Sequence, residues 1–306
     1  MINYDLIREN YLKGKYEKHT YIKKMHRLHK HLFFFPNLIK NSDIKNIDLN
    51  QENIVATLDC GMKLYLDEND SRFIPIEILN FGKFEDNEKK AIEYIAANSK
   101  IIADIGANVG YYTLKFSQSK SVNKIYSFEA IPRTYNILKS HIQLNHCKKA
   151  LLINKAISNI NEKKNFYWTK LETGSASMKN IQNRKEINKV NVEAITFDSY
   201  FWKKKIEVDF IKCDVEGSEL FVFQGATKYL KDYKPIIFCE LLRKWSKKFN
   251  YSPNEVINLI CRYGYNCYQL NKNKLKKITK ITEKTVNTNF FFMHPTRHKK
   301  FINKFK

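Results

Sequence analysis

Short apolar runs alternate with amphipathic segments along the chain from residue 100 to residue 293. The apolar runs have the length of buried strands and occupy 100–105, 124–129, 150–153, 208–213, 235–240, 265–270 and 289–293. Helical patterns lie between them, the clearest at 109–117, 132–145 and 253–264, and the last begins with the capping box Ser252-Pro253-Asn254-Glu255. Strands that alternate with helices form parallel sheets covered on both faces. The pattern therefore predicts an α/β fold with a mostly parallel, seven-stranded sheet.

The remaining segments predict additions to this sheet. Two more strands are expected at 165–168 and 188–194, with a loop at 173–177 between them. Residues 1–50 are polar, basic and aromatic, and favour a basic helix on a solvent or membrane surface. A β-hairpin is expected at 53–66, and helices at 72–81 and 85–97 are separated by Gly82. We expect an N-terminal extension over 1–70, a main domain over 71–295 and a basic tail over 296–306.

The net charge of +23 is the unusual feature of the composition. It would suit nucleic acid, an anionic membrane face or phosphorylated substrates. The basic residues are spread over the whole chain and are mostly Lys, whereas Arg dominates where phosphates or bases are recognised in bidentate fashion. We therefore favour a compositional origin for the charge, as in AT-rich coding DNA, and do not expect nucleic acid as a partner.

The sequence favours a cytoplasmic location. Its longest strongly apolar candidate for a membrane segment, residues 32–35, is cut by Pro36, and the charged N-terminus does not read as a secretory signal. Six cysteines are scattered without a Cys-x-x-Cys pair, and three lie within predicted strands. This usage is typical of buried free thiols in a reducing compartment.

The first predicted strand leads into a turn that suits a nucleoside-containing cofactor. Asp104 is followed by Gly106, Asn108 and Gly110, and Glu129 ends the next strand, where a carboxylate can bind the hydroxyls of a ribose. Dinucleotide sites usually need a Gly-x-Gly-x-x-Gly turn against the pyrophosphate, and Asp104 would repel one. A carboxylate there suits a cofactor with a positive centre, such as S-adenosylmethionine. The alternative is that both glycines serve only tight packing between strand and helix.

Acidic residues stand at four strand ends, where ligands bind in such sheets: Asp104, Glu129, Asp214 and Glu240. Each could instead be a helix N-cap. The segment Ile-Lys-Cys-Asp214-Val-Glu216-Gly217-Ser-Glu219 is the richest, with three carboxylates in six residues.

The motifs together resemble the FkbM family of S-adenosylmethionine-dependent methyltransferases. The resemblance rests on Asp-Ile-Gly-Ala-Asn-Val-Gly-Tyr-Tyr, Ser-Phe-Glu-Ala-Ile-Pro, Ile-Lys-Cys-Asp-Val-Glu-Gly-Ser-Glu-Leu and Gln-Gly-Ala, in this order, and runs from about residue 79 to 293. Ile131 departs from the family's usual Glu-Pro pattern. The resemblance implies a Rossmann-like class I methyltransferase fold and O-methylation of a hydroxyl on a sugar, glycan or related small molecule.

The resemblance also implies roles for individual residues. The cofactor would be bound by the turn, by Glu129 at the ribose, by Ala156 near the adenine, and by Glu85 and Ser177 near the methionine end; the full set is Glu85, Asp104, Gly106, Asn108, Gly110, Glu129, Ala156 and Ser177. A hydroxyl needs a base to become a good nucleophile. Asp214 is the first choice, with Glu216, Glu240 or a divalent cation held between carboxylates such as Asp214 and Glu240 as alternatives. Strand alternation is expected to point Lys212 away from the site.

Two other functions are compatible with parts of the sequence. An RNA methyltransferase would account for the charge, but no Asn-Pro-Pro-Tyr-type segment, catalytic cysteine pair or RNA-binding module is recognisable. A cofactor-binding protein without catalytic activity would be expected to have lost the Asp214 segment, which is intact. The expected partner is a sugar, nucleotide-sugar or glycan acceptor, and peripheral membrane contact and a homodimer are further expectations.

Overall fold

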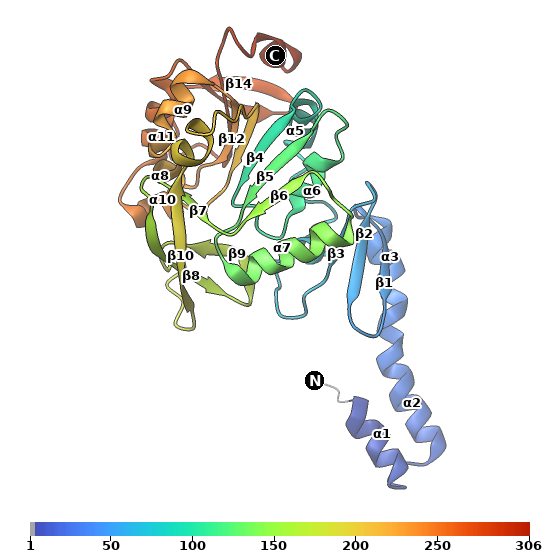
Figure 1. Ribbon diagram of the computed structural model, residues 1–306. Coiled ribbons are helices and arrows are strands. Elements are labelled where there is room, and N and C mark those ends of the chain that lie inside the picture. The colour runs from blue at the N-terminus through green and yellow to red at the C-terminus, as the bar shows by residue number, and fades with distance from the viewer. Residues whose placement is uncertain (1–3) are drawn as a thin grey trace.

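A sheet of eight strands forms the centre of this protein in the computed structural model, which describes residues 4–306 (Figure 1). Residues 1–3 of the predicted extension lie outside the described part. The strands follow the order β14-β13-β15-β12-β11-β4-β5-β6. Their bounds are β4 Ile101–Ile105, β5 Lys124–Phe128, β6 Ala150–Ile153, β11 Phe210–Cys213, β12 Ile236–Glu240, β13 Asn266–Asn271, β14 Lys274–Ile278 and β15 Asn289–Met293.

The sheet is mostly parallel, as predicted. Strands β6, β5, β4, β11 and β12 pair in parallel, and β15 runs antiparallel between β12 and β13. The eighth strand, β14, pairs antiparallel with β13 at one edge and was not predicted. Its sequence, Lys-Leu-Lys-Lys-Ile, lacks the apolar run that predicts a buried strand. Lysines are common on edge strands, where they face water and discourage pairing with another chain.

Alternating side chains of the sheet enter two separate cores. Ile102 and Phe210 face one core with helices α5, α6 and α7, whereas Ala103 and Ile211 face the other with α8, α9 and α11. Both faces are therefore covered, which accounts for the continuously apolar strands of the sequence. These helices are α5 Lys89–Ala96, α6 Tyr111–Ser117, α7 Pro132–Leu144, α8 Glu219–Gln224, α9 Thr227–Asp232 and α11 Pro253–Cys261.

A second sheet of four strands lies near the ends of the central strands, in the order β7-β10-β8-β9. Strands β8 and β10 were predicted, but β9 covers the segment expected to be a loop. Its small residues, including Gly174, have low β-propensity, and its pairing with β8 supplies the order that the local sequence does not. The bounds are β7 Ala156–Ser158, β8 Glu162–Thr169, β9 Glu172–Ser177 and β10 Asn188–Thr196.

The N-terminal part consists of helices followed by a three-stranded sheet. The predicted hairpin is formed by β2 and β3, and β1 adds a third strand to it. Buried His141 of α7 ties this sheet to the body, because its Nε2 accepts a hydrogen bond from Tyr65 N and its Nδ1 contacts Val109 O. The elements are α1 Tyr4–Leu12, α2 Lys18–His29, a 3₁₀ turn Lys30–Phe34, α3 Phe35–Lys40, β1 Ile44–Leu49, β2 Ile54–Leu58, β3 Lys63–Tyr65 and α4 Ile74–Phe81.

Short elements complete the chain. The predicted helix over 85–97 begins only at Lys89, which leaves Glu85 in a loop with a positive φ of 47°. The predicted basic tail contains a helix that buries Ile302 against the first core. The remaining elements are a π-helical turn Asp198–Trp202, α10 Arg243–Ser246, a 3₁₀ turn Lys247–Phe249 and α12 Lys299–Lys304.

All six cysteines are free, and Cys213, Cys239 and Cys267 of the strands are buried, as the sequence predicted. Within residues 4–306, no helix is both long and apolar enough to cross a membrane.

Candidate functional site

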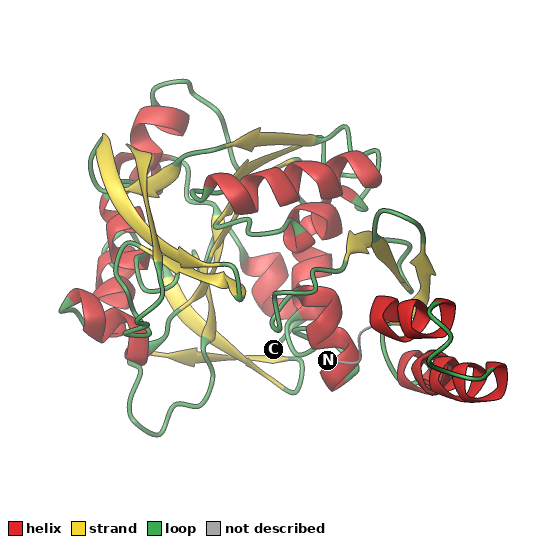
Figure 2. Cartoon of the chain, turned by 90° about the horizontal axis from the view of Figure 1, so that it is seen from below, coloured by secondary structure: helices red, strands yellow, loops and turns green. Residues whose placement is uncertain are grey.

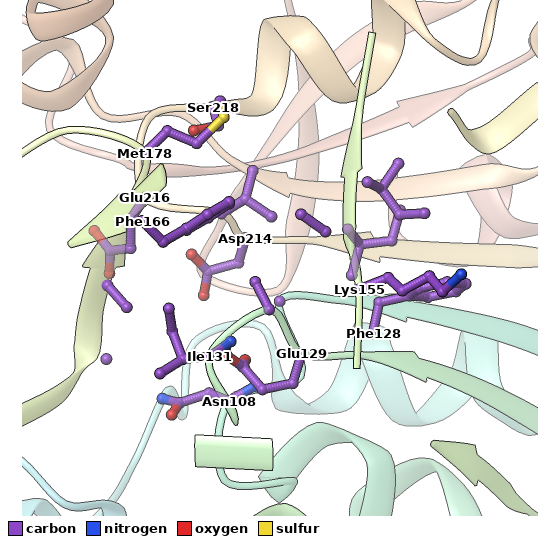
Figure 3. Close-up of a pocket in the computed structure, with 18 of the residues that line it drawn as sticks. Asn108, Phe128, Glu129, Ile131, Lys155, Phe166, Met178, Asp214, Glu216 and Ser218 are labelled. Atoms are coloured by element: carbon purple, nitrogen blue, oxygen red, sulfur yellow. Dashed lines mark hydrogen bonds between the residues drawn. The ribbon is translucent and has the colours of Figure 1, made fainter. Parts of the chain in front are cut away.

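The candidate site lies where the strand order of the central sheet reverses. After β4 the chain continues to β5 and β6 on one side, and it then returns to β11 on the other side of β4. Loops diverge at such a point and leave a crevice at the carboxyl ends of the strands. A pocket occupies this place, and we call it the cofactor pocket (Figure 3). It is lined by Ile105, Gly106, Asn108, Phe128, Glu129, Ala130, Ile131, Lys155, Ala156, Ile157, Phe166, Thr173, Gly174, Ala176, Met178, Asp214, Val215, Glu216 and Ser218.

The turn after β4 forms the floor of the cofactor pocket. Gly106 has a φ of +75°, and a Cβ on it would lie 1.8 Å from the backbone oxygen of Asp214. The amides of Gly106 and Ala107 both donate to the carbonyl of Phe128, which holds the turn against β5. Glycine is therefore required at 106 for the close approach of two strand ends.

Glu129 is fixed at the end of β5 by two backbone amides. Asn108 N donates to its Oε2 at 2.9 Å, and Ile131 N donates to its Oε1 at 2.8 Å. Burial raises the pKa of this carboxyl to about 7, although both amide hydrogen bonds oppose the shift. Each carboxylate oxygen can accept a second hydrogen bond, so Glu129 can still bind hydroxyl groups in the pocket.

Apolar side chains form another wall of the cofactor pocket. Ala156, predicted near an adenine, lines it together with Ile131, Phe166 and Met178. Figure 3 draws Phe166 and Met178 on the Glu216 side of the pocket, and Ile131 near Asn108 and Glu129. A planar base can pack against such a wall, whereas a charged group would be desolvated there without compensation.

A second pocket adjoins the first, and we call it the carboxylate pocket. The two pockets share Asn108, Gly174, Asp214 and Glu216. The carboxylate pocket is also lined by Arg72, Ile74, Glu77, Phe84, Glu85, Glu172, Ser175, Gln182, Glu240, Leu242 and Trp245. A molecule in the cofactor pocket and one in the carboxylate pocket would thus both contact these shared residues.

Three predicted catalytic residues meet in the carboxylate pocket. One carboxylate oxygen from each of Asp214, Glu216 and Glu240 lies within 4.8 Å of the other two, so the group could hold a metal ion. Burial, followed by the charge of Asp214, raises the pKa of Glu240 to about 10 and that of Glu85 to about 8. The same two causes raise the pKa of Glu216. The cluster can therefore take up protons or stabilise a cation.

Lys212 lies at the base of the site, and the prediction that it points elsewhere is wrong. Its Nζ donates to Gly106 O at 2.8 Å and lies 3.6 Å from a carboxylate oxygen of Asp104 and of Asp214. The signal was present in the sequence, since residues two apart on a strand point to the same face. Lys212 therefore shares a face with Asp214, and the pairing of β11 with β4 places it beside Asp104.

Three residues that were predicted to bind the cofactor do not line the cofactor pocket. Asp104 is fully buried and accepts a hydrogen bond from Thr113, Gly110 packs closely against Leu138, and neither lines the cofactor pocket. The hydroxyl of buried Ser177 donates to the backbone oxygen of Glu216, so it orders that loop. The contact of Gly110 with Leu138 is compatible with the packing alternative, and its role at the cofactor stays a prediction.

Some residues of the site were not identified from the sequence. Arg72 lines the carboxylate pocket and pairs with Glu77 at 3.1 Å, and Tyr112 donates a hydrogen bond to Glu85. Arg72 comes from a segment outside every motif, so only the tertiary structure identifies it. Glu219 of the acidic segment is structural, because its carboxylate accepts from the amides of Val215 and Gly217.

A family profile matches the part of the chain that carries the site. The sequence profile described as Methyltransferase FkbM domain matches residues 104–267, which is more than half of the chain. No curated protein matches the sequence. The profile match and the observed strand order confirm the predicted Rossmann-like class I fold.

Solved structures of methyltransferases are similar at low identity. Methyltransferase FkbM from Methylobacillus flagellatus KT is 13% identical with a TM-score of 0.42; the match covers 64% of this chain and 44% of that one. An O-methyltransferase from Bacillus cereus in complex with SAH is 15% identical, with a TM-score of 0.35 and coverage of 68% and 80%. A SAM-dependent O-methyltransferase from Thermotoga maritima is 11% identical, with a TM-score of 0.38 and coverage of 81% and 84%. This chain thus spans less than half of the Methylobacillus protein.

Proposed function

Because this chain belongs to the FkbM methyltransferase family, we propose that it transfers a methyl group from S-adenosylmethionine to a hydroxyl oxygen of a sugar, glycan or related small molecule. One observation carries the proposal: a pocket suited to a nucleoside shares Asp214 with a pocket rich in carboxylates. The transferred group and the acceptor would meet at that shared residue.

The residues of the cofactor pocket fit S-adenosylmethionine. Glu129 can accept hydrogen bonds from two ribose hydroxyls, and the apolar wall can cover the adenine. Asn108 Oδ1 is buried and accepts no hydrogen bond from residues 4–306, which leaves an acceptor for a donor on the cofactor. When bound, the cofactor supplies a methyl group on a positively charged sulfur.

The position of Asp214 supports a role as the base that would remove the proton from the acceptor hydroxyl. It lines both pockets, and its Oδ2 lies 3.6 Å from the Nζ of buried Lys212. Glu216 and Glu240 would take the role of hydrogen-bond acceptors for the acceptor molecule. They would alternatively hold a divalent cation with Asp214, which would acidify a bound hydroxyl.

A carboxylate-rich pocket suits a polyhydroxylated acceptor. Hydroxyl groups donate and accept hydrogen bonds, and the carboxyl groups of this pocket accept them when ionised and also donate one when protonated. Arg72 adds a positive group at this pocket that could contact the phosphate of a nucleotide sugar.

Release of S-adenosylhomocysteine tests the proposal. The wild-type protein is assayed with nucleotide sugars, glycan extracts and bulk tRNA, each with and without EDTA. Turnover on a sugar or glycan supports the proposal, turnover confined to tRNA overturns it, and loss of turnover with EDTA identifies the cation-dependent form.

Two variants separate binding from chemistry. Asp214→Asn should keep cofactor affinity and lower turnover about 100-fold or more, because it removes the base. Glu129→Ala should weaken cofactor binding about 10- to 100-fold, because hydrogen bonds to a charged group are lost. Asp59→Asn, on an exposed turn of the hairpin, is the matched control and should change neither. Normal turnover of Asp214→Asn would rule out Asp214 as the base.

A further inference from the structure

The first three helices form an arm that stands out from the body of the protein. We define the N-terminal arm as residues 4–40, which comprise α1, α2, the 3₁₀ turn Lys30–Phe34 and α3. Both views place these helices beside the three-stranded sheet at the edge of the molecule (Figures 1 and 2). Helix α1 folds back on α2, where Tyr11 stacks on Tyr21 at 4.2 Å and Lys24 lies over the ring of Tyr16.

Helices normally bury an apolar stripe, but this arm buries almost none of its side chains. Met25 is the one buried residue among the helical elements of residues 4–40. Large apolar side chains are instead exposed where α2 passes into α3, with Phe33 at 70% and Phe34 at 55%. Leu32, Phe35 and Leu38 are also exposed. A contiguous patch of this kind typically marks a surface that contacts something else.

Most of the arm, residues 18–40, carries positively charged side chains and no negatively charged ones. Residues 18–40 contain no Asp or Glu, and their basic residues are Lys18, Lys23, Lys24, Arg27, Lys30 and Lys40, with histidines at 19, 26, 29 and 31. Lys23, Arg27 and Lys30 are exposed at a helical spacing of four and three, so they lie along one side of the arm. Basic side chains next to exposed Phe and Leu are the composition of a helix that lies in a membrane interface.

We propose that the N-terminal arm docks on an anionic lipid surface, with residues 32–38 entering the boundary between headgroups and acyl chains. The lysines and Arg27 would lie among the acidic headgroups. The proposal does not depend on which molecule the enzyme methylates.

The charge and the side-chain types of the arm favour a lipid surface as its partner over a second copy of this chain or an RNA. A second copy would bring an equally basic arm against the first, and like charges repel. RNA bases stack on aromatic side chains and on Arg, but residues 4–40 contain only Arg8 and Arg27, and the exposed cluster includes Leu32 and Leu38, on which bases do not stack. The transfer of Phe and Leu side chains from water into hydrocarbon is favourable.

Vesicle binding of the full chain tests the proposal. Sedimentation is measured with phosphatidylcholine vesicles and with vesicles that also contain phosphatidylglycerol, at low and high salt. We expect binding to the anionic vesicles only, weakened by salt. Each basic residue near an anionic surface contributes about fivefold in affinity, so Lys23→Gln, Arg27→Gln and Lys30→Gln together should weaken binding on the order of 100-fold.

A charge-matched control separates the arm from the net charge of the chain. Lys203, Lys204 and Lys205 are exposed and lie outside the N-terminal arm, and their replacement by Gln removes the same charge. This control should bind as the wild type does. Equal losses in both triple variants would show non-specific attraction and overturn the docking surface.

The apolar part of the proposal has its own variant. Phe33→Ser with Phe34→Ser should weaken vesicle binding at least tenfold, because two apolar side chains no longer enter the interface. Leu171→Ser with Val286→Ser removes exposed apolar groups elsewhere and should have no effect. Circular dichroism should be unchanged in all variants, since every substituted residue is exposed.

Three results would overturn the proposal. The first is absence of binding to anionic vesicles by the wild type. The second is a dimer in solution that Phe33→Ser with Phe34→Ser dissociates, which would identify a second copy as the occupant. The third is binding of tRNA, but not of vesicles, that the arm variants abolish.

Discussion

Lys212 offers a direct measure of how the site is held together, through the substitution Lys212→Met. Its side chain is 4% exposed, Asp104 is 0% exposed, and the ammonium lies 3.6 Å from the carboxylates of both Asp104 and Asp214. Methionine has a similar length but no charge. It would leave a buried carboxylate without its cation and Gly106 O without its donor. Removing one partner of a buried ion pair costs about 3–5 kcal/mol of unfolding free energy.

The pH dependence of this loss has a definite sign. Burial raises the pKa of Asp104, and Lys212 opposes that shift. Without the lysine the pKa of Asp104 in the folded state rises further above its unfolded value. The folded variant then binds a proton more readily than the unfolded chain does, so its stability falls as pH rises above the unfolded pKa. The deficit relative to the wild type should therefore be larger at pH 8 than at pH 5.

Urea unfolding at both pH values provides the measurement, with Lys115→Met as the matched control. Lys115 also pairs with a carboxylate, at 2.7 Å, but its partner Glu93 is 48% exposed, so its loss should cost at most about 1 kcal/mol. Adding Asp104→Asn to Lys212→Met should recover part of the stability, because the unpaired charge is removed. A cost for Lys212→Met no larger than for Lys115→Met would refute the reasoning.

Two further predictions concern the turn and the carboxylates. Gly106→Ala should destabilise the protein by about 3 kcal/mol or more in urea unfolding, because its Cβ would meet the backbone oxygen of Asp214. Gly61→Ala is the control, since Gly61 has a similar positive φ with open space around it, and it should cost only about 1 kcal/mol. Equal costs for the two variants would contradict the close approach at Gly106. The pKa of Glu240 is raised to about 10 in the folded state, so its contribution to the stability of the wild type should fall as pH rises from about 5 to about 10. Glu240→Gln should therefore flatten the dependence of unfolding free energy on pH. An unchanged slope between pH 6 and pH 9 would argue against the raised pKa.

The local sequence determined the central sheet and the first pocket. Apolar runs of strand length, with helical patterns between them, permit little other than a covered parallel sheet. Once that sheet is accepted, the strand ends carry Asp104, Glu129, Asp214 and Glu240 to one edge. This is why the sequence predicts a cofactor site at Glu129 and a cluster of carboxylates that includes the candidate metal ligands Asp214 and Glu240.

Other features depended on contacts between distant segments. Strand β9 is held by β8, β14 is a polar edge strand, and Arg72 reaches the site from the turn before α4, outside every motif. The sequence signal for a strand is weak at β9 and β14, because their residues have low β-propensity or are polar. Pairing with neighbouring strands stabilises both strands nonetheless.

The direction of individual side chains marks the boundary between the two kinds of information. The sequence alone determined which residue types stand at the strand ends, because hydrophobic periodicity places the ends of the strands. Only the tertiary structure decided which of them face the pockets: Glu129, Asp214, Glu216 and Glu240 do, whereas Asp104 is used beneath them to pair with Lys212. The reason is physical, since a buried charge needs a partner, and that partner is supplied by a strand more than 100 residues away in the chain.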